Sequence, residues 1–327
     1  MNSTFFQKQF LGMIYKHYAH EYWPLVSFQA MGVSLMNIAY PDECSVYYSA
    51  SFSSTVDLTF RGQYPNHNDA LFWNLTFYDD GGNIFGSVEE NNFPNFFYEF
   101  QVKNGALVLD DMEIPIPSKY YCIIQRIYTK RPGIIFPKYI PKITSGDKNI
   151  ITYISHTKRL KNSKKFEKMF QNFYRFFHGV QSNFPYSTEF MKPPLDKVSK
   201  AFPNPRAIYY IIKLSSTKNI LVLSGTRPLH MNRDKPIQYA SIMISNYKTL
   251  GTDKSISLQD LPMNYEIYIG PQKSMDLKQK ENILEWDVQN KNPVIVIRFL
   301  ISSFQWNELK FYENYVKTFL PKVHVMI

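Results

Sequence analysis

The chain has 327 residues, 44% of them hydrophobic and 17% aromatic, which excludes general disorder and allows two domains with sizeable cores. Its two cysteines, Cys44 and Cys122, exclude a disulfide framework and a cysteine-rich zinc site, and they favour a reducing compartment such as the cytoplasm. The formal net charge of +10 points to acidic partners without choosing among nucleic acid, anionic lipid and an acidic protein surface.

The first predicted element is a helix in the N-terminal segment 1–44. Side chains recur there at helical spacing: Phe6, Phe10, Met13, Ile14 and His17. Because Lys8 and Lys16 interrupt the apolar run, we expect no signal peptide. No stretch of the sequence approaches the length of about 18 apolar residues that predicts a membrane span.

Residues 45–150 indicate a first β-sandwich domain. Alternating β-branched and aromatic residues begin at Ser45, and the polar run Asp79-Asp80-Gly81-Gly82 predicts a hairpin turn. Short strand patterns follow in YEFQV, ALVLDDMEIPI and YYCIIQRIY, at the spacing typical of a sandwich or jelly roll.

The connecting segment 151–200 predicts an amphipathic helix at about 160–178. Phe166, Phe170, Phe173 and Phe177 fall on one stripe, and we expect Phe170 and Phe173 to be buried. The basic residues lie mainly elsewhere: Lys161, Lys164, Lys165, Lys168 and Arg175. They form a candidate binding surface for an acidic partner or nucleic acid. A helix that buries its phenylalanines and leaves Lys164 and Lys168 in water explains both faces without a ligand, and is the preferred interpretation.

Residues 201–305 indicate a second β-sandwich domain, with strand patterns in AIYYIIKLSS, NILVLSGTRP, IQYASIMISNY, SISLQDL, NYEIYIG and PVIVIRFLI. In the C-terminal segment 306–327, residues 307–319 predict a short helix before Pro321. The predicted fold is mainly β: tandem duplicated, jelly-roll-like β-sandwiches with a connecting amphipathic helix and short terminal helices.

A short motif occurs once in each half. GQYPNH places Gly62, Pro65 and His67 at the same offsets as Gly225, Pro228 and His230 in GTRPLH. In both halves an aromatic strand follows, and the closing strand carries a single arginine, Arg126 or Arg298, inside an apolar run. This recurrence of order predicts an internal duplication in which the two motifs mark the same structural corner.

The sequences of the two halves resemble those of a family of two-sandwich proteins of unknown function found in bacteria and in some large DNA viruses. The resemblance rests on LTFRGQYP, LFWNLTFYDDGG and IIQRIY in the first half, and on LVLSGTRP, QYASIMI and ILEWDVQNKNPVIVIRFL in the second. It covers roughly residues 45–140 and 200–305. The Lys, Asn, Tyr and Phe-rich composition is typical of AT-rich genomes, which include many large viruses.

No local catalytic signature is present, since Gly-x-Ser-x-Gly, His-Glu-x-x-His and the phosphate-binding loop pattern are all missing from the sequence. His67 and His230 are weak catalytic candidates, as general bases or metal ligands at a strand end. The preferred interpretation gives each ring a turn-capping bond to a backbone carbonyl. We expect neither a metal nor a cofactor.

Two other sets of polar residues have competing interpretations. Arg126 and Arg298 would form either a repeated structural ion pair, which is preferred because an unpaired buried charge is costly, or a ligand clamp. The pairs Asp79-Asp80 and Asp110-Asp111 would divide acid and base roles or hold calcium, but hairpin positions explain them better.

The sequence therefore predicts a non-enzymatic structural or interaction protein that binds other proteins, with a capsid-associated virion component as its most specific form. The alternative is a hydrolase or isomerase that acts on a carbohydrate or small molecule at a cleft between the two domains.

Overall fold

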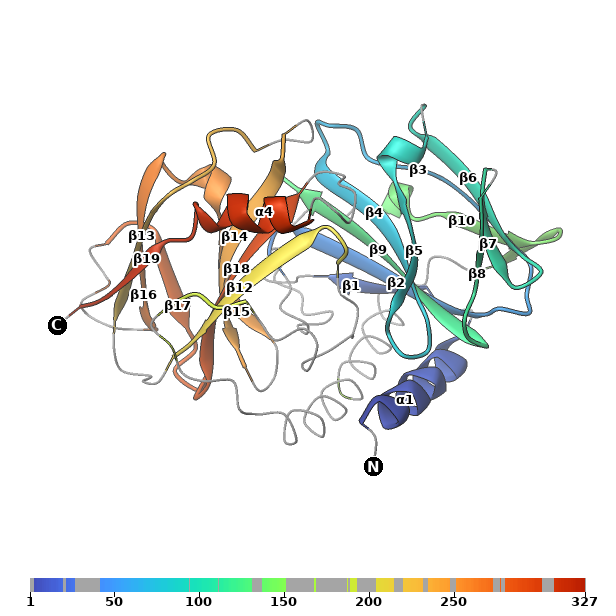
Figure 1. The fold of residues 1–327 in the computed structure, drawn as a ribbon, viewed down its shortest axis with the longest axis horizontal. Coiled ribbons are helices and arrows are strands. Elements are labelled where there is room, and N and C mark those ends of the chain that lie inside the picture. The colour runs from blue at the N-terminus through green and yellow to red at the C-terminus, as the bar shows by residue number, and fades with distance from the viewer. Residues whose placement is uncertain are drawn as a thin grey trace. The chain divides into compact units, whose positions relative to one another are not determined.

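The structure, a computed structural model, describes residues 3–19, 22–26, 42–93, 95–110, 112–130, 137–150, 168, 187, 189–192, 204–214, 220–231, 235–247, 251–272, 277, 280–301 and 309–326. These residues form four β-sheets and two α-helices, which confirms the predicted mainly β class (Figure 1). They belong to two compact units. Unit 1 comprises Met1–Met36, Cys44–Phe173 and Ser199–Pro205, and unit 2 comprises Asn37–Glu43, Tyr174–Val198 and Arg206–Ile327.

Unit 1 is a sandwich of two antiparallel sheets with a hydrophobic core between them. The first sheet has the order β1 (Tyr22–Val26), β2 (Ser45–Ser53), β9 (Tyr120–Thr129), β4 (Ala70–Tyr78) and β5 (Ile84–Glu89). The second has the order β11 (Lys148–Ile150), β10 (Lys142–Ser145), β3 (Leu58–Gln63), β6 (Phe97–Lys103), β7 (Ala106–Leu109) and β8 (Met112–Pro115).

Strand alternation decides which side chains enter this core. On β4, Trp73, Leu75 and Phe77 are buried between the sheets, whereas Asn74 and Thr76 are buried on the opposite face of the same sheet. On β6 every second residue is exposed, because the second sheet has one face toward solvent. The exposed face of this second sheet is where the candidate site lies.

The helix α1 (Ser3–Tyr18) packs against β2 and β9 with Leu11, Ile14 and Tyr15 fully buried. The predicted helix is confirmed, and of the side chains singled out in the sequence Ile14 is buried, whereas Met13 is 56% exposed and His17 is exposed. The buried positions 11, 14 and 15 follow the i, i+3, i+4 spacing of one helix face. The segment 1–44 is also not purely helical, since β1 within it pairs with β2.

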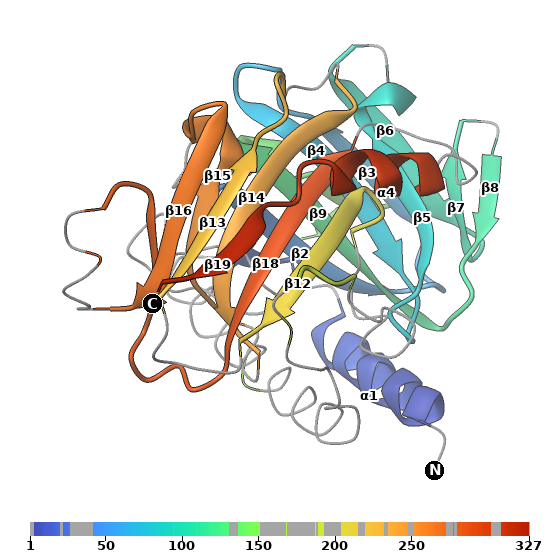
Figure 2. The same ribbon diagram turned by 60° about the vertical axis from the view of Figure 1, so that its left-hand side comes forward.

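Unit 2 is a second sandwich with its own core. One sheet has the order β12 (Ala207–Lys213), β18 (Pro293–Ile301), β14 (Ile237–Asn246) and β15 (Thr252–Ser257), and these strands lie side by side in Figure 2. The other has the order β17 (Ile283–Trp286), β16 (Asn264–Pro271), β13 (Leu221–Thr226) and β19 (Lys322–Val325), in which β16 and β17 run parallel.

The C-terminal segment contains the predicted helix and an element that the sequence pattern did not indicate. The helix α4 (Leu309–Lys317) inserts Val316 into the core of unit 2. The chain then continues as β19, which pairs with β13. The described residues 309–326 therefore complete the second sandwich.

The two units share one strand plan. The order β2-β9-β4-β5 in unit 1 corresponds to β12-β18-β14-β15 in unit 2. The register irregularities recur as well: β4 shifts between Ala70 and Phe72 against β9, and β14 shifts between Ile237 and Tyr239 against β18. A single-turn 3-10 helix follows the edge strand in both units, at Glu90–Asn92 (η2) and Leu258–Asp260 (η4). Bulges are retained features of a fold, so this agreement supports the predicted duplication.

The predicted helix at about 160–178 in the connector lies outside the described residues except for Lys168, which is helical and exposed. The predictions for Phe170, Phe173, Lys161, Lys164, Lys165 and Arg175 fall on residues that the structure does not describe.

Candidate binding groove

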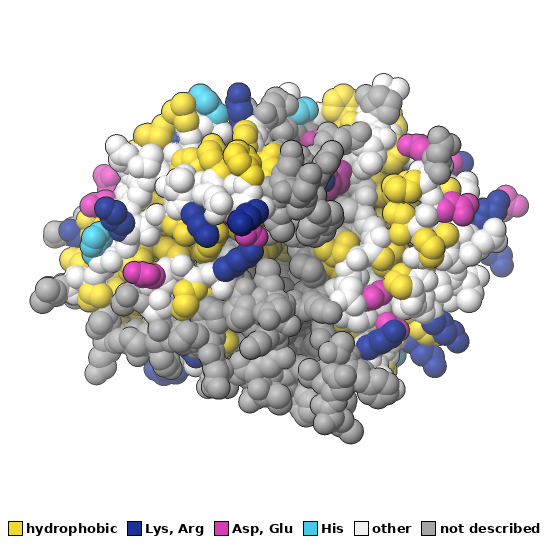
Figure 3. Space-filling model, in the orientation of Figure 1, with side chains coloured by type: hydrophobic (Ala, Val, Ile, Leu, Met, Phe, Trp, Pro, Cys, Tyr) yellow, Lys and Arg dark blue, Asp and Glu magenta, His cyan; other side chains and the backbone are white. Residues whose placement is uncertain are grey.

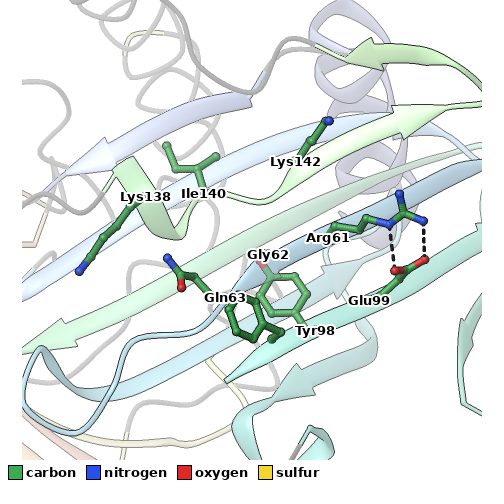
Figure 4. Close-up of a pocket in the computed structure, with 9 residues that line it drawn as sticks. Arg61, Gly62, Gln63, Tyr98, Glu99, Lys138, Ile140 and Lys142 are labelled. Carbon is green, nitrogen blue, oxygen red and sulfur yellow. Dashed lines mark hydrogen bonds and ion pairs between the residues drawn. The ribbon is translucent and has the colours of Figure 1, made fainter. Parts of the chain in front are cut away.

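A groove of about 520 Å³ lies on the exposed face of the second sheet of unit 1 (Figure 4). Residues of β3, β6, β10 and the 3-10 turn η3 (Pro137–Tyr139) contribute to it. It is lined by Arg61, Gly62, Gln63, Phe97, Tyr98, Glu99, Lys138, Ile140 and Lys142. Three cationic side chains and one carboxylate give this lining a positive balance.

The strand register places the charged side chains of the groove in one row. Lys142 on β10 lies opposite Arg61 on β3, and Arg61 lies opposite Glu99 on β6. Two like charges directly opposite each other repel, so Arg61 is best directed toward Glu99. It does so with both arms of the guanidinium, with Nε–Oε2 and Nη2–Oε1 distances of 2.9 Å.

The Arg61–Glu99 pair leaves the Lys142 ammonium group available for contact with an acidic ligand. The hydrogen bond from Arg61 lowers the pKa of the Glu99 carboxyl, which is therefore ionised at neutral pH. Both partners are more than half exposed, so the pair adds little to stability. Its main effect is on charge distribution: Glu99 neutralises Arg61, while Lys142 makes no ion pair with the residues that the structure describes.

The other end of the groove is held by a small hydrogen-bonded cluster. Lys138 Nζ lies 3.3 Å from Asp69 Oδ2 and 4.6 Å from the centre of the Tyr139 ring. The Tyr139 hydroxyl donates to the same carboxylate oxygen, and this bond lowers the pKa of Asp69. Gln125 Nε2 donates to the Tyr139 carbonyl at 2.6 Å, which ties the cluster to the buried strand β9. Lys138 is thus positioned by its neighbours.

Apolar and amide groups occupy the middle of the groove. Figure 4 shows Ile140 and Gln63 between Lys138 at one end and Lys142 with Arg61 at the other. Phe97, which lies opposite Gln63, is 69% exposed. The nine lining residues include no histidine, cysteine, serine or threonine; the titratable side chains among them are Arg61, Tyr98, Glu99, Lys138 and Lys142.

The repeated Gly-x-x-Pro-x-His motif borders this groove in unit 1. Gly62 lies opposite Tyr98, and Gly225 lies opposite Tyr265, with each tyrosine 2% exposed. A Cβ atom at Gly62 would lie 2.4 Å from the Tyr98 hydroxyl, and one at Gly225 would lie 2.9 Å from the Tyr265 hydroxyl. The glycine is therefore required because a tyrosine ring passes over it. Pro65 and Pro228 are both buried, as expected for a structural corner.

The predicted turn-capping role of the histidines is wrong. His67 and His230 are both exposed, and neither has a hydrogen bond to the described residues. The amide of Asn66 caps the first corner instead, since its Oδ1 accepts from the Asn68 and Asp69 nitrogens at 2.9 and 3.0 Å. Short side chains of this kind bond their own backbone two or three residues on, whereas an imidazole at the next position points to water.

We expect His67→Asn and His230→Asn to change the free energy of unfolding by less than about 0.5 kcal/mol, because exposed side chains without partners contribute little. Asn66→Ala is the matched comparison and should cost about 1 kcal/mol through its lost backbone bonds. Urea unfolding of the three variants measures both values. A loss above 1 kcal/mol in either histidine variant would restore the capping interpretation.

The second corner is held by a different residue. Arg227 Nε donates to the Leu261 carbonyl at 2.8 Å, and its backbone nitrogen donates to the Met263 carbonyl at 2.9 Å. The two copies therefore keep the glycine and the proline as structural positions, while the polar support of the turn differs.

Arg126 and Arg298 occupy corresponding central strands and both are buried. Each guanidinium lies over a tyrosine ring of the neighbouring strand, Arg126 over Tyr47 at 5.8 Å and Arg298 over Tyr209 at 5.2 Å. Arg126 donates to Thr76 Oγ1 and to the Tyr78 hydroxyl, at 3.1 and 2.6 Å. Burial raises the pKa of Tyr78 to about 12, so this phenol is neutral at pH 7.

In unit 2 the predicted ion pair is present. Arg298 Nη1 lies 3.9 Å from Asp42 Oδ2, and both side chains are 1% exposed. The Tyr239 hydroxyl donates to the other Asp42 oxygen at 2.7 Å. Next to it, Glu43 and Ser255 exchange two hydrogen bonds of 3.1 Å. What recurs between the copies is the arginine over a tyrosine, and the contacts beyond that differ.

The remaining polar candidates that the structure describes lie in turns, and Asp111 falls outside the described residues. Asp79 accepts bonds of 2.8 Å from the Gly81 and Asn83 nitrogens in the turn between β4 and β5, as predicted for a hairpin residue. Asp110 has a left-handed φ of 48° in the turn before β8. Both cysteines are buried, and burial raises the pKa of Cys122 to about 12.

Searches for metal and membrane features cover the described ranges alone. Within them, no three histidine, cysteine, aspartate or glutamate side chains gather as a metal site requires. Neither α1 nor any other described helix has the length and apolar character that crossing a membrane needs.

A second exposed surface lies on α4. Phe311 is 66% exposed and stacks on Tyr315, with ring planes 3° apart. Figure 3 shows hydrophobic side chains gathered over this helix, with Lys and Arg side chains beside them.

Sequence reasoning missed the groove residues. Alternation in LTFRGQ places Arg61 and Gln63 on the face opposite Leu58 and Phe60, so the sequence alone predicts that both side chains face away from the core. The sequence does not predict which residues lie beside them, because only the strand register brings Glu99, Phe97 and Lys142 there.

Comparison with solved structures supports the fold. No protein-family model matches this chain, and no curated protein matches its sequence. An uncharacterized protein from Burkholderia cenocepacia superposes with a TM-score of 0.60 at 8% identity, over 98% of this chain and 86% of that one. A protein from Vibrio parahaemolyticus gives a TM-score of 0.52 at 10% identity, over 99% of this chain and 98% of that one. At these identities the likeness concerns the fold.

Proposed function

We propose that this chain is a non-enzymatic interaction protein that binds an acidic partner through the groove of unit 1. The observation that carries the proposal is the lining of the groove: exposed lysines at both ends, an apolar middle, and a carboxylate already occupied by Arg61. Such a lining supplies charge and contact area, and it includes no histidine, cysteine, serine or threonine. Acidic partners also fit the net charge of +10.

Assembly into a virus particle is the narrower form of this proposal. It is supported by the composition and by the family resemblance, and the exposed aromatic pair on α4 suits a protein that contacts neighbours in an assembly. The hydrolase or isomerase alternative stays a prediction from the sequence.

Hydrogen exchange with poly-L-glutamate and poly-L-lysine as model partners tests the proposed function. We expect poly-L-glutamate to protect backbone amides of β3, β6 and β10, and poly-L-lysine to leave them unchanged. In parallel, the parent protein is screened for hydrolysis of sugar, ester and phosphate substrates. No protection of these strands, or turnover that disappears in a stably folded His67→Asn or His230→Asn variant, would contradict the proposal.

A further inference from the structure

We propose that the occupant of the groove is an extended acidic segment of a partner protein, with an apolar side chain between two acidic side chains at alternate positions. This inference rests on the proposed function and specifies the ligand of the same groove. Alternate residues of an extended chain point the same way, about 6.6 Å apart, so one face of the segment presents acid, apolar group and acid in a row.

The two acidic positions are matched by the two ends of the groove. Lys142 has no ion-pair partner among the described residues and is exposed. Lys138 contacts Asp69, but an ammonium group has three donors and its side chain is 57% exposed, so a second carboxylate has access. Because Asp69 and Tyr139 hold Lys138 in place, less side-chain entropy is lost when a ligand binds.

The apolar position is matched by the middle of the groove. Phe97 and Ile140 offer an apolar surface there, and the Gln63 amide can donate to or accept from a peptide backbone. An exposed phenylalanine is the type of side chain that is enriched in protein interfaces.

Other occupants fit less well. Small-molecule sites enclose most of their ligand, whereas this groove lies on an open sheet face with Phe97 69% exposed. Nucleic acid is bound through many phosphate contacts, and this groove offers two lysines whose neighbours include Glu99 and Asp69. A second copy of this chain carries the same charge of +10, which opposes self-association here.

The test uses fluorescent 11-residue peptides and the full-length protein. The central five residues are Glu-Gly-Leu-Gly-Glu in the first peptide, Glu-Glu-Leu-Gly-Gly in the second and Gln-Gly-Leu-Gly-Gln in the third, and anisotropy measures binding. We expect the first peptide to bind at least about fivefold more tightly than the other two. Lys142→Glu should weaken that binding about tenfold, since an attraction becomes a repulsion.

Control variants separate the groove from general charge. Lys310→Glu changes an exposed lysine of unit 2 and should leave peptide binding unchanged. Phe97→Ala keeps the charge of the groove and should weaken binding of the first peptide several-fold, because it removes the apolar contact. The exposed ring is not part of the core, so this variant should fold normally.

Three outcomes would overturn the inference. Equal binding of the first two peptides would show that spacing is not read, and the proposed function would stand if poly-L-glutamate still protected the groove. Tighter binding of a 12-residue oligothymidylate, lost in Lys142→Glu, would assign the groove to nucleic acid. Equal loss of binding in Lys310→Glu and Lys142→Glu would show that peptide binding depends on the net charge of the protein and not on the groove.

Discussion

Asp42→Ala should destabilise unit 2 by about 3–5 kcal/mol, because it leaves the buried Arg298 guanidinium without its carboxylate. It also removes the acceptor of the Tyr239 hydroxyl. Hydrogen exchange of β14 and β18 peptides during urea unfolding measures the loss within unit 2.

Two further variants separate the lost ion pair from other effects of Asp42→Ala. Asp147→Ala removes an exposed carboxylate and should be nearly neutral. The double variant Asp42→Leu/Arg298→Met removes both charges and should recover most of the stability, since apolar residues often replace buried ion pairs without loss. An Asp42→Ala protein as stable as the parent would show that Arg298 does not depend on this carboxylate.

Gly62→Ala should destabilise unit 1 by about 1–3 kcal/mol, the usual cost of overpacking. The new methyl group would lie 2.4 Å from the Tyr98 hydroxyl and 2.6 Å from Cζ, so the buried ring must shift. Gly225→Ala should act in the same direction in unit 2, where Pro321 Cα lies 3.2 Å from the added atom in addition to the Tyr265 ring.

A double-mutant cycle shows whether the tyrosine is the cause. Gly62→Ala should cost much less in a Tyr98→Leu background, because the shorter side chain leaves room for the methyl group. The free energy of unfolding of all four proteins is measured in urea. An equal cost of Gly62→Ala in both backgrounds would mean that backbone conformation, and not the ring, requires glycine at this corner.

The strands were predictable because they follow from local patterns. Alternation along β2 and the apolar, β-branched and aromatic runs of β4, β9, β14 and β18 mark these segments as strands whatever their partners are. The repeated glycine and proline marked the shared corner for the same reason: close backbone approach and a fixed φ are properties of the residues themselves.

Side-chain roles at the same corner were not predictable. His67 and Asn66 are adjacent polar residues in one turn, and the pattern alone does not tell which of them bonds the backbone. The buried face of α1 shows the same difficulty, since several phases of a helix bury apolar residues and packing against β2 and β9 selects one.

The amino-acid sequence of this chain thus contains the class of fold, the positions of most strands and the recurrence that predicts a duplication, because each depends on periodicity or on the recurrence of short segments. The groove and the buried ion pair come from contacts between residues far apart in the chain. Arg61 meets Glu99 and Lys142 through the register of three strands, and Asp42 meets Arg298 across 256 positions of sequence (298 − 42). Register and long-range pairing are set by the packing of whole sheets, so the three-dimensional structure was needed to assemble the site.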